Sequence, residues 1–109
     1  MPTIYKVLGQ VAPSATTLTT LYTVPSATDT VVSTIAICNR AGTAGTYRIA
    51  VRPAGATLAN QHYIVFGATV AASDSVLLTV GLTLDTTDVI SVFASSADMS
   101  FSAFGSEIS

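Results

Sequence analysis

Charge is scarce in this 109-residue sequence. Only 9% of the residues are charged, with four Lys or Arg, six Asp or Glu and a formal net charge of -2. Four basic side chains are too few to follow a phosphate backbone, so the composition excludes a nucleic-acid-binding protein. Lys and Glu are nearly absent and β-branched residues dominate, which excludes helical bundles and coiled coils.

Cysteine, targeting signals and long apolar runs are also lacking. The one cysteine, Cys38, cannot form an intramolecular disulfide, which favours synthesis in a reducing cytoplasm. The first ten residues lack the basic region and apolar stretch of a signal peptide. The uncharged stretch from Pro53 to Ser73 is interrupted by polar residues, so it is not the apolar run of about 20 residues that crosses a membrane.

Apolar residues, by contrast, are abundant. Half of the chain is hydrophobic, and the mean hydropathy is +0.62. This content, together with the small net charge, excludes disorder. A domain of this length buries only about two thirds of its unfolded surface, so the apolar excess must face solvent or another chain. We therefore expect one domain, residues 1–109, that works as an oligomer or as a component of an assembly.

Apolar periods close to two predict an all-β chain. Eight strands are expected, at residues 4–10, 18–24, 30–39, 46–52, 61–70, 75–82, 88–94 and 99–107, and Pro or Gly residues lie in several of the segments between them. Eight short strands with frequent turns predict an antiparallel two-sheet β-sandwich, either Ig-like or jelly-roll. The one expected helical turn covers residues 57–60.

The pleat of a strand places alternate side chains on opposite faces. Over residues 46–52, the expected core side chains are Tyr47, Ile49 and Val51. The expected outward side chains are Arg48, Ala50 and Arg52. In residues 30–39 the same alternation predicts Val31, Ile35 and Ile37 on one face, with Val32 on the other.

No group of residues points to catalysis or to a bound cofactor. His62 and Cys38 have no carboxylate placed to complete a nucleophilic set, and a histidine at a strand edge is the favoured interpretation. Asp85 and Asp88 are spaced closely enough for a calcium loop but lack its further oxygen ligands and its Gly. Aspartates beside strand ends more often bond backbone N–H groups. We expect no catalytic residue, no cofactor, no metal and no enzymatic activity.

Two groups of residues are candidates for contacts with other chains. Arg40, Arg48 and Arg52 are three of the four basic residues, and they mark either a solvated strand face or a contact with another subunit. The segment 1–10 places Ile4 and Tyr5 beside Lys6, and chain termini are free to reach a neighbour. The alternative for this segment is a strand that completes the sandwich. The candidate interface residues are Ile4, Tyr5, Lys6, Arg40, Arg48 and Arg52.

The sequence resembles small β-sandwich virion proteins of tailed bacteriophages, including cyanophages. The resemblance covers nearly the whole chain and is most specific in the segments TLYTVP, ICNR…YRIAVRP and FSAFGSEI. Proteins of this kind decorate and reinforce the capsid as cement proteins, commonly as homotrimers on the outer shell. The resemblance therefore implies a location in the virion and the phage major capsid protein as a partner. It implies no active-site residue.

Related modules also occur in tail appendages, so the resemblance leaves a second function open. In that case the chain is a tail-fibre, tailspike or baseplate module that recognises a receptor or glycan on the host surface. Glycan sites usually present exposed Trp or Tyr side chains. This chain has no Trp, and its Tyr residues fall mostly within expected strands.

Overall fold

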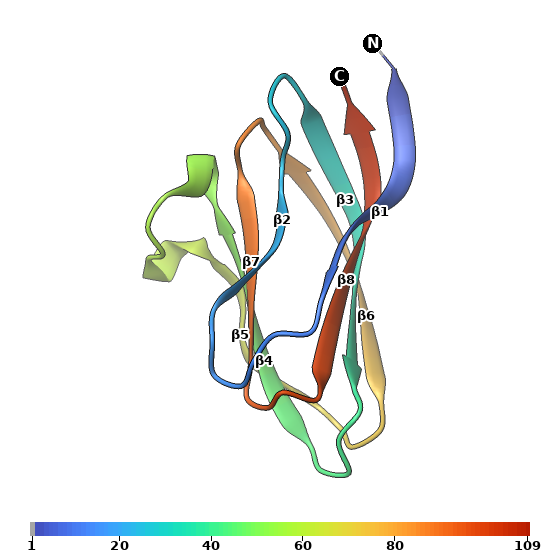
Figure 1. Cartoon of the computed structure of the whole chain (residues 1–109), viewed down its shortest axis with the longest axis vertical. Coiled ribbons are helices and arrows are strands. Elements are labelled where there is room, and N and C mark those ends of the chain that lie inside the picture. Colours follow the sequence, from blue (N-terminus) through green and yellow to red (C-terminus); the bar gives the residue numbers. More distant parts are fainter. Residues whose placement is uncertain (1) are drawn as a thin grey trace.

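A computed structural model describes residues 2–109 as eight strands and two short helical turns (Figure 1). The strands are β1 (Thr3–Val11), β2 (Thr19–Thr23), β3 (Asp29–Asn39), β4 (Gly45–Arg52), β5 (Tyr63–Val70), β6 (Ser75–Leu84), β7 (Val89–Ala94) and β8 (Met99–Ile108). The turns are η1 (Pro53–Gly55) and η2 (Asn60–His62). The eight predicted strands are confirmed, and their ends agree with the predicted ones to within two residues. Met1, the first residue of the expected contact segment 1–10, lies outside the described residues.

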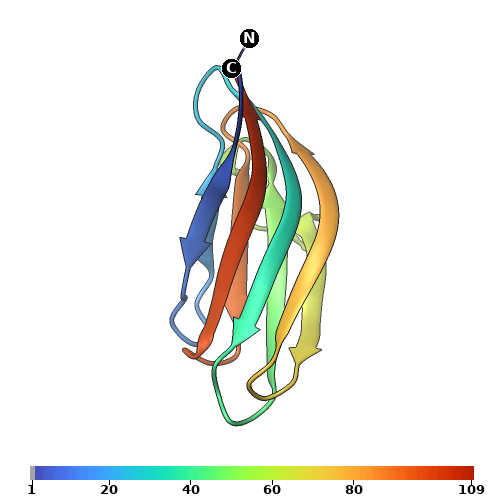
Figure 2. The ribbon, with the colours of Figure 1, turned by 90° about the vertical axis from the view of Figure 1, so that its right-hand side faces the viewer.

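Two antiparallel four-stranded sheets pack face to face, which confirms the predicted β-sandwich. The first sheet has the order β1-β8-β3-β6 and the second sheet the order β2-β7-β4-β5. Figure 2 shows the four strands of the first sheet side by side. The pairs β1–β8, β2–β7, β3–β6 and β4–β5 are nested, as in a long hairpin folded over itself. Of the two expected alternatives, this order is the jelly roll.

The core lies between the sheets and contains side chains from all eight strands. Tyr47 and Ile49 are buried as predicted, and Val51 is partly buried against the core. The Tyr47 ring meets the Phe101 ring edge-on, with ring centres 6.2 Å apart. Aromatic pairs in this geometry add to the stability from burial alone.

A β-bulge in β3 overturns the predicted alternation of that strand. Val32 pairs with Gly105 of β8 and Thr34 pairs with Phe104, so Ser33 has no partner on β8. The extra residue reverses which side chains face inward. Val32 is therefore fully buried on the same face as Ile35, and Val31 is only partly buried, so the prediction that Val31 and not Val32 shares a face with Ile35 is wrong.

The segment 53–62 leaves the sandwich and folds over the outer side of the second sheet (Figure 1). It contains both helical turns, so the predicted turn at 57–60 and the predicted start of a strand at residue 61 are wrong. The Nδ1 atom of His62 accepts the N–H of Ala59 at 3.0 Å, which closes the second turn. Turn η1 contacts β7, and turn η2 contacts β4. Ala50 is only 1% exposed, although it lies on the predicted outward side of β4.

Candidate interaction surfaces

The outer side of the first sheet is here called the uncharged face. Among residues 2–109, it carries no charged side chain between its ends. Strand register places its outward residues in rows across all four strands. These outward residues are Tyr5, Val7 and Gln10 of β1, Ser102, Phe104 and Ser106 of β8, Val31, Thr34 and Ala36 of β3, and Leu77, Thr79 and Thr83 of β6. Tyr5 is 84% exposed and Leu77 is 68% exposed. Large exposed apolar side chains on a face without charge are typical of interaction surfaces.

Two carboxylates stand at one end of the uncharged face. Asp29 begins β3 and Asp85 follows β6, and both line a shallow depression of about 360 Å³. A hydrogen bond to Asp85 raises the pKa of the Asp29 carboxyl, with smaller contributions from desolvation and from the charge of Asp85. The negative charge of this face is thus confined to its rim.

Strand β1 both completes the sandwich and exposes apolar side chains. It pairs with β8 from Thr3 to Val11, which confirms the alternative in which this segment is part of the fold. Ile4 and Tyr5, both candidate interface residues, nevertheless remain largely exposed. The two interpretations of the N-terminal segment are therefore compatible.

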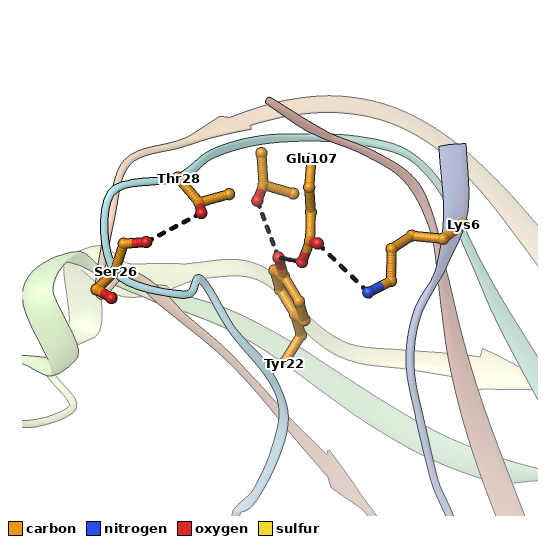
Figure 3. Close-up of polar contacts among 6 residues, drawn as sticks. Lys6, Tyr22, Ser26, Thr28 and Glu107 are labelled. Atoms are coloured by element: carbon orange, nitrogen blue, oxygen red, sulfur yellow. Dashed lines mark hydrogen bonds and ion pairs between the residues drawn. The ribbon is translucent and has the colours of Figure 1, made fainter. Parts of the chain in front are cut away.

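Lys6, the third candidate in this segment, belongs to a polar network that joins the two sheets (Figure 3). Its Nζ atom lies 3.3 Å from Oε1 of Glu107, in the one ion pair found among residues 2–109. The other carboxylate oxygen of Glu107 accepts the hydroxyl of Tyr22 at 2.5 Å, and this hydroxyl also contacts Oγ1 of Thr30 at 2.9 Å. The charge of Lys6 is thus compensated within the chain.

The network keeps the Tyr22 phenol protonated. Burial is the main cause of the shift, and the hydrogen bond to Glu107 adds to it, while the bond to Thr30 opposes it. Together these contacts raise the pKa of Tyr22 to about 12. Because Tyr22 lies in the second sheet and Glu107 in the first, the bond holds the two sheets together near the chain termini (Figure 3).

The outer side of the second sheet, here called the arginine face, carries Arg48 and Arg52 of β4. Arg48 pairs across the sheet with Phe66 of β5 and Phe93 of β7. Its guanidinium carbon lies 4.2 Å from the centre of the Phe66 ring and 4.4 Å from that of Phe93. The Tyr63 ring packs edge-on against Phe66, with ring centres 4.9 Å apart. Cation–π contacts of this kind fix a guanidinium in place.

The other two candidate arginines bond within the chain. Nε of Arg52 donates to Oγ of Ser91 at 3.1 Å, and its Nη1 donates to the carbonyl of Ala56. Arg52 thereby ties the segment 53–62 to the sheet. Arg40 lies in the turn after β3, and its Nη2 donates to the carbonyl of Ala97 at 3.2 Å. Only Arg48 and Arg52 share a face.

The residues weighed for catalysis and metal binding are dispersed. Cys38 is exposed in β3 of the first sheet, whereas His62 lies in the segment that covers the second sheet. Both carboxylate oxygens of Asp88 accept backbone N–H groups, from Ala54 and Asp85. Within residues 2–109 no three His, Cys, Asp or Glu side chains are grouped to hold a metal ion. The same residues contain no helix with the length and apolar character of a membrane span.

Sequence reasoning did not single out Phe66 and Phe93 as partners of Arg48, nor Tyr22 as a partner of Glu107. All of these residues belong to predicted strands, but each pairing depends on the register between separate strands, and Phe93 and Glu107 lie on strands distant in sequence from those of their partners. The available signal was the presence of Phe and Tyr residues in several expected strands of a chain with few charges. That signal does not specify register.

Comparison with known proteins shows the fold. A chain in the structure of infectious bursal disease virus, Gx strain, aligns with 97% of this chain at a TM-score of 0.51 and 15% sequence identity. This chain spans 30% of the length of that viral chain. No protein-family model and no curated protein matches the sequence.

Proposed function

We propose that this chain is a non-enzymatic structural protein of a tailed-phage virion. In this proposal it is a capsid cement, or decoration, protein that binds the outer shell as a homotrimer. Its partners are its own copies and the phage major capsid protein. It is made in the host cytoplasm and acts by contact alone.

The observation that carries the proposal is the jelly-roll strand order, with a structural counterpart in a virus. Jelly rolls recur in capsid proteins, although the fold alone does not determine function. The resemblance of the sequence to small phage virion proteins supports the same role. The uncharged face adds a physical reason, because apolar and hydroxyl side chains are desolvated at a much lower cost than charges.

Reinforcement needs no chemistry. Each copy that spans neighbouring capsid subunits buries surface that must be exposed again when the shell ruptures. Because many equivalent sites are occupied, modest individual contacts sum to a large stabilisation. Strand β1 is proposed to form part of the contact with the shell through its exposed side chains Ile4, Tyr5 and Val7.

Two measurements test this proposal. Light scattering of the purified protein should give three times the 11.1 kDa mass of the chain. Co-sedimentation with undecorated capsids should show saturable binding, and deletion of residues 1–5 should weaken binding while leaving the trimer intact. A monomer at micromolar concentration would contradict the oligomer, and unchanged binding after the deletion would remove β1 from the contact.

The tail-appendage alternative predicts different results in the same assays. Such a module would bind tail fibres or whole host cells and would leave undecorated capsids free. A pull-down with host cells, run beside the capsid assay, therefore distinguishes the two virion locations. Binding to cells or fibres without binding to capsids would overturn the cement proposal.

A further inference from the structure

Arg48 is the one arginine whose guanidinium is positioned by aromatic rings instead of hydrogen bonds. Arg40 and Arg52 donate to oxygen atoms within the chain, and no such bond is found for Arg48 among residues 2–109. Phe66 and Phe93 lie about 4 Å from its guanidinium carbon. Ring contacts restrict the side chain but leave N–H donors free.

The positive charge of Arg48 is also unpaired. The ion pair between Lys6 and Glu107 is the one found in the described part of the chain, so no carboxylate lies within 4.0 Å of Arg48. A guanidinium held in place has already lost much of the side-chain freedom that binding would otherwise remove. It therefore suits a partner that supplies the missing negative charge.

The surroundings of Arg48 favour a protein partner over a glycan. Phe66, whose ring contacts the guanidinium, is 63% exposed, so apolar surface lies close to the charge. The next outward row on β4 and β5 consists of Thr46 and Thr69. Asn, Gln, Asp and Glu, which commonly bond sugar hydroxyls, are absent from these outward rows. Arg beside aromatic side chains is the composition typical of protein–protein hot spots.

We propose that Arg48, with Phe66 and Phe93, is a docking site for a carboxylate of a partner protein, an Asp or Glu flanked by an apolar side chain. The planar guanidinium donates two parallel N–H···O bonds to such a group. The exposed part of the Phe66 ring then covers the apolar neighbour. This proposal deepens the structural role proposed above by naming a contact and its chemistry, and its test uses no capsid, so the two proposals can fail separately.

The test is a titration of the intact protein with short end-capped peptides, followed by backbone amide NMR. One peptide contains Glu flanked by Leu, and its counterpart has Gln in place of Glu. The Glu peptide should shift the amide signals of β4, β5 and β7 around Arg48, and the Gln peptide should bind about tenfold more weakly or not at all. This mapping on the unmodified protein requires no variant.

Matched variants locate the effect. Arg48→Gln should weaken binding of the Glu peptide about tenfold, while Arg52→Gln, which removes the same charge from the same strand face, should change it little. Arg48→Lys should restore binding only in part, because an ammonium group lacks the planar fork. Circular dichroism confirms that each variant is folded.

Three results would overturn the proposal. Equal binding of the Glu and Gln peptides would exclude recognition of a carboxylate. Equal losses of peptide binding in Arg48→Gln and Arg52→Gln would show that general electrostatic attraction holds the peptide, and not a specific site at Arg48. Binding of oligogalacturonate at Arg48, with no binding of the Glu peptide, would assign the site to an acidic glycan.

Discussion

The two outer faces of the sandwich differ in the charged side chains that they present. On the uncharged face, four strands present hydroxyl and apolar side chains, and the carboxylates of Asp29 and Asp85 stand at one end. On the arginine face, Arg48 is stacked between aromatic rings and Arg52 anchors the segment 53–62. The first face can be covered at little desolvation cost, whereas the second offers a directional charge. The two faces are therefore suited to different contacts. The uncharged face is suited to extensive burial, and the arginine face on the opposite side is suited to recognition of a specific group.

The largest effect on stability is expected inside the sandwich and separates the two sides of β4. Ile49 is fully buried, and its replacement by Ala leaves a cavity, so Ile49→Ala should cost about 2–5 kcal/mol of unfolding free energy. Arg48→Ala, one residue earlier and on the outer side, should cost about 1 kcal/mol through lost cation–π contacts. Urea unfolding measures both values. Equal losses of unfolding free energy in the two variants would mean that the Arg48 side chain contributes as much to stability as a core side chain.

The next largest effect is expected where the two sheets are joined by Tyr22. Tyr22→Phe removes the hydroxyl from a hydrogen bond to a charged group, so it should cost about 1.5–3 kcal/mol. Urea unfolding at pH 7 provides the measurement. Thr23→Ala is the control, because it alters an exposed neighbour on the same strand.

The pH dependence gives a second measurement on the same network. The pKa of Tyr22 is raised from 10.0 to about 12 in the folded protein, so folding holds this proton more tightly than the unfolded chain does. The resulting stability is fully present below pH 10 and is lost as the pH rises from 10 to about 12. Tyr22→Phe should show a shallower decline over this range. The same decline in both proteins would exclude Tyr22 as its source.

The inward or outward positions of individual side chains show what the sequence alone can predict. Alternation within a strand is local, so it correctly placed Tyr47 and Ile49 in the core. The burial of Val32 depends on a bulge that is defined only by pairing with β8, and local alternation therefore gave the wrong face. Ala50 is buried although its strand position predicts exposure, because a segment later in the chain folds over the sheet.

The candidate site was predictable only in part, for a related reason. The scarcity of charge drew attention to Arg48, and the structure places it on an outer face as expected. Its partners Phe66 and Phe93 come from β5 and β7, and β7 is distant in the sequence. Their meeting depends on both the order and the register of three strands. A single sequence contains no local pattern for that register.

A smaller effect is expected on the arginine face. Phe66→Leu removes one of the two rings that hold Arg48, but the ring is 63% exposed, so the loss should be about 0.5–1 kcal/mol. Urea unfolding measures this loss, and Ile64→Leu, a neighbouring apolar exchange on β5, is the control. If Phe66→Leu costs no more than the control, the cation–π contact contributes nothing measurable to the folded state.

The smallest effect on stability is expected on the uncharged face, where one substitution tests whether the whole face contacts the capsid shell. Leu77 is 68% exposed near the far edge from β1, so Leu77→Glu should change the unfolding free energy by no more than about 0.5 kcal/mol. If the whole face meets the shell, the buried carboxylate has no partner and binding to undecorated capsids should be lost. Gly42→Glu is the control, because its side chain enters open space in the turn between β3 and β4, outside the strands of this face. Unchanged capsid binding by Leu77→Glu would restrict the contact to the β1 side, since a charge on β6 would then stay in water.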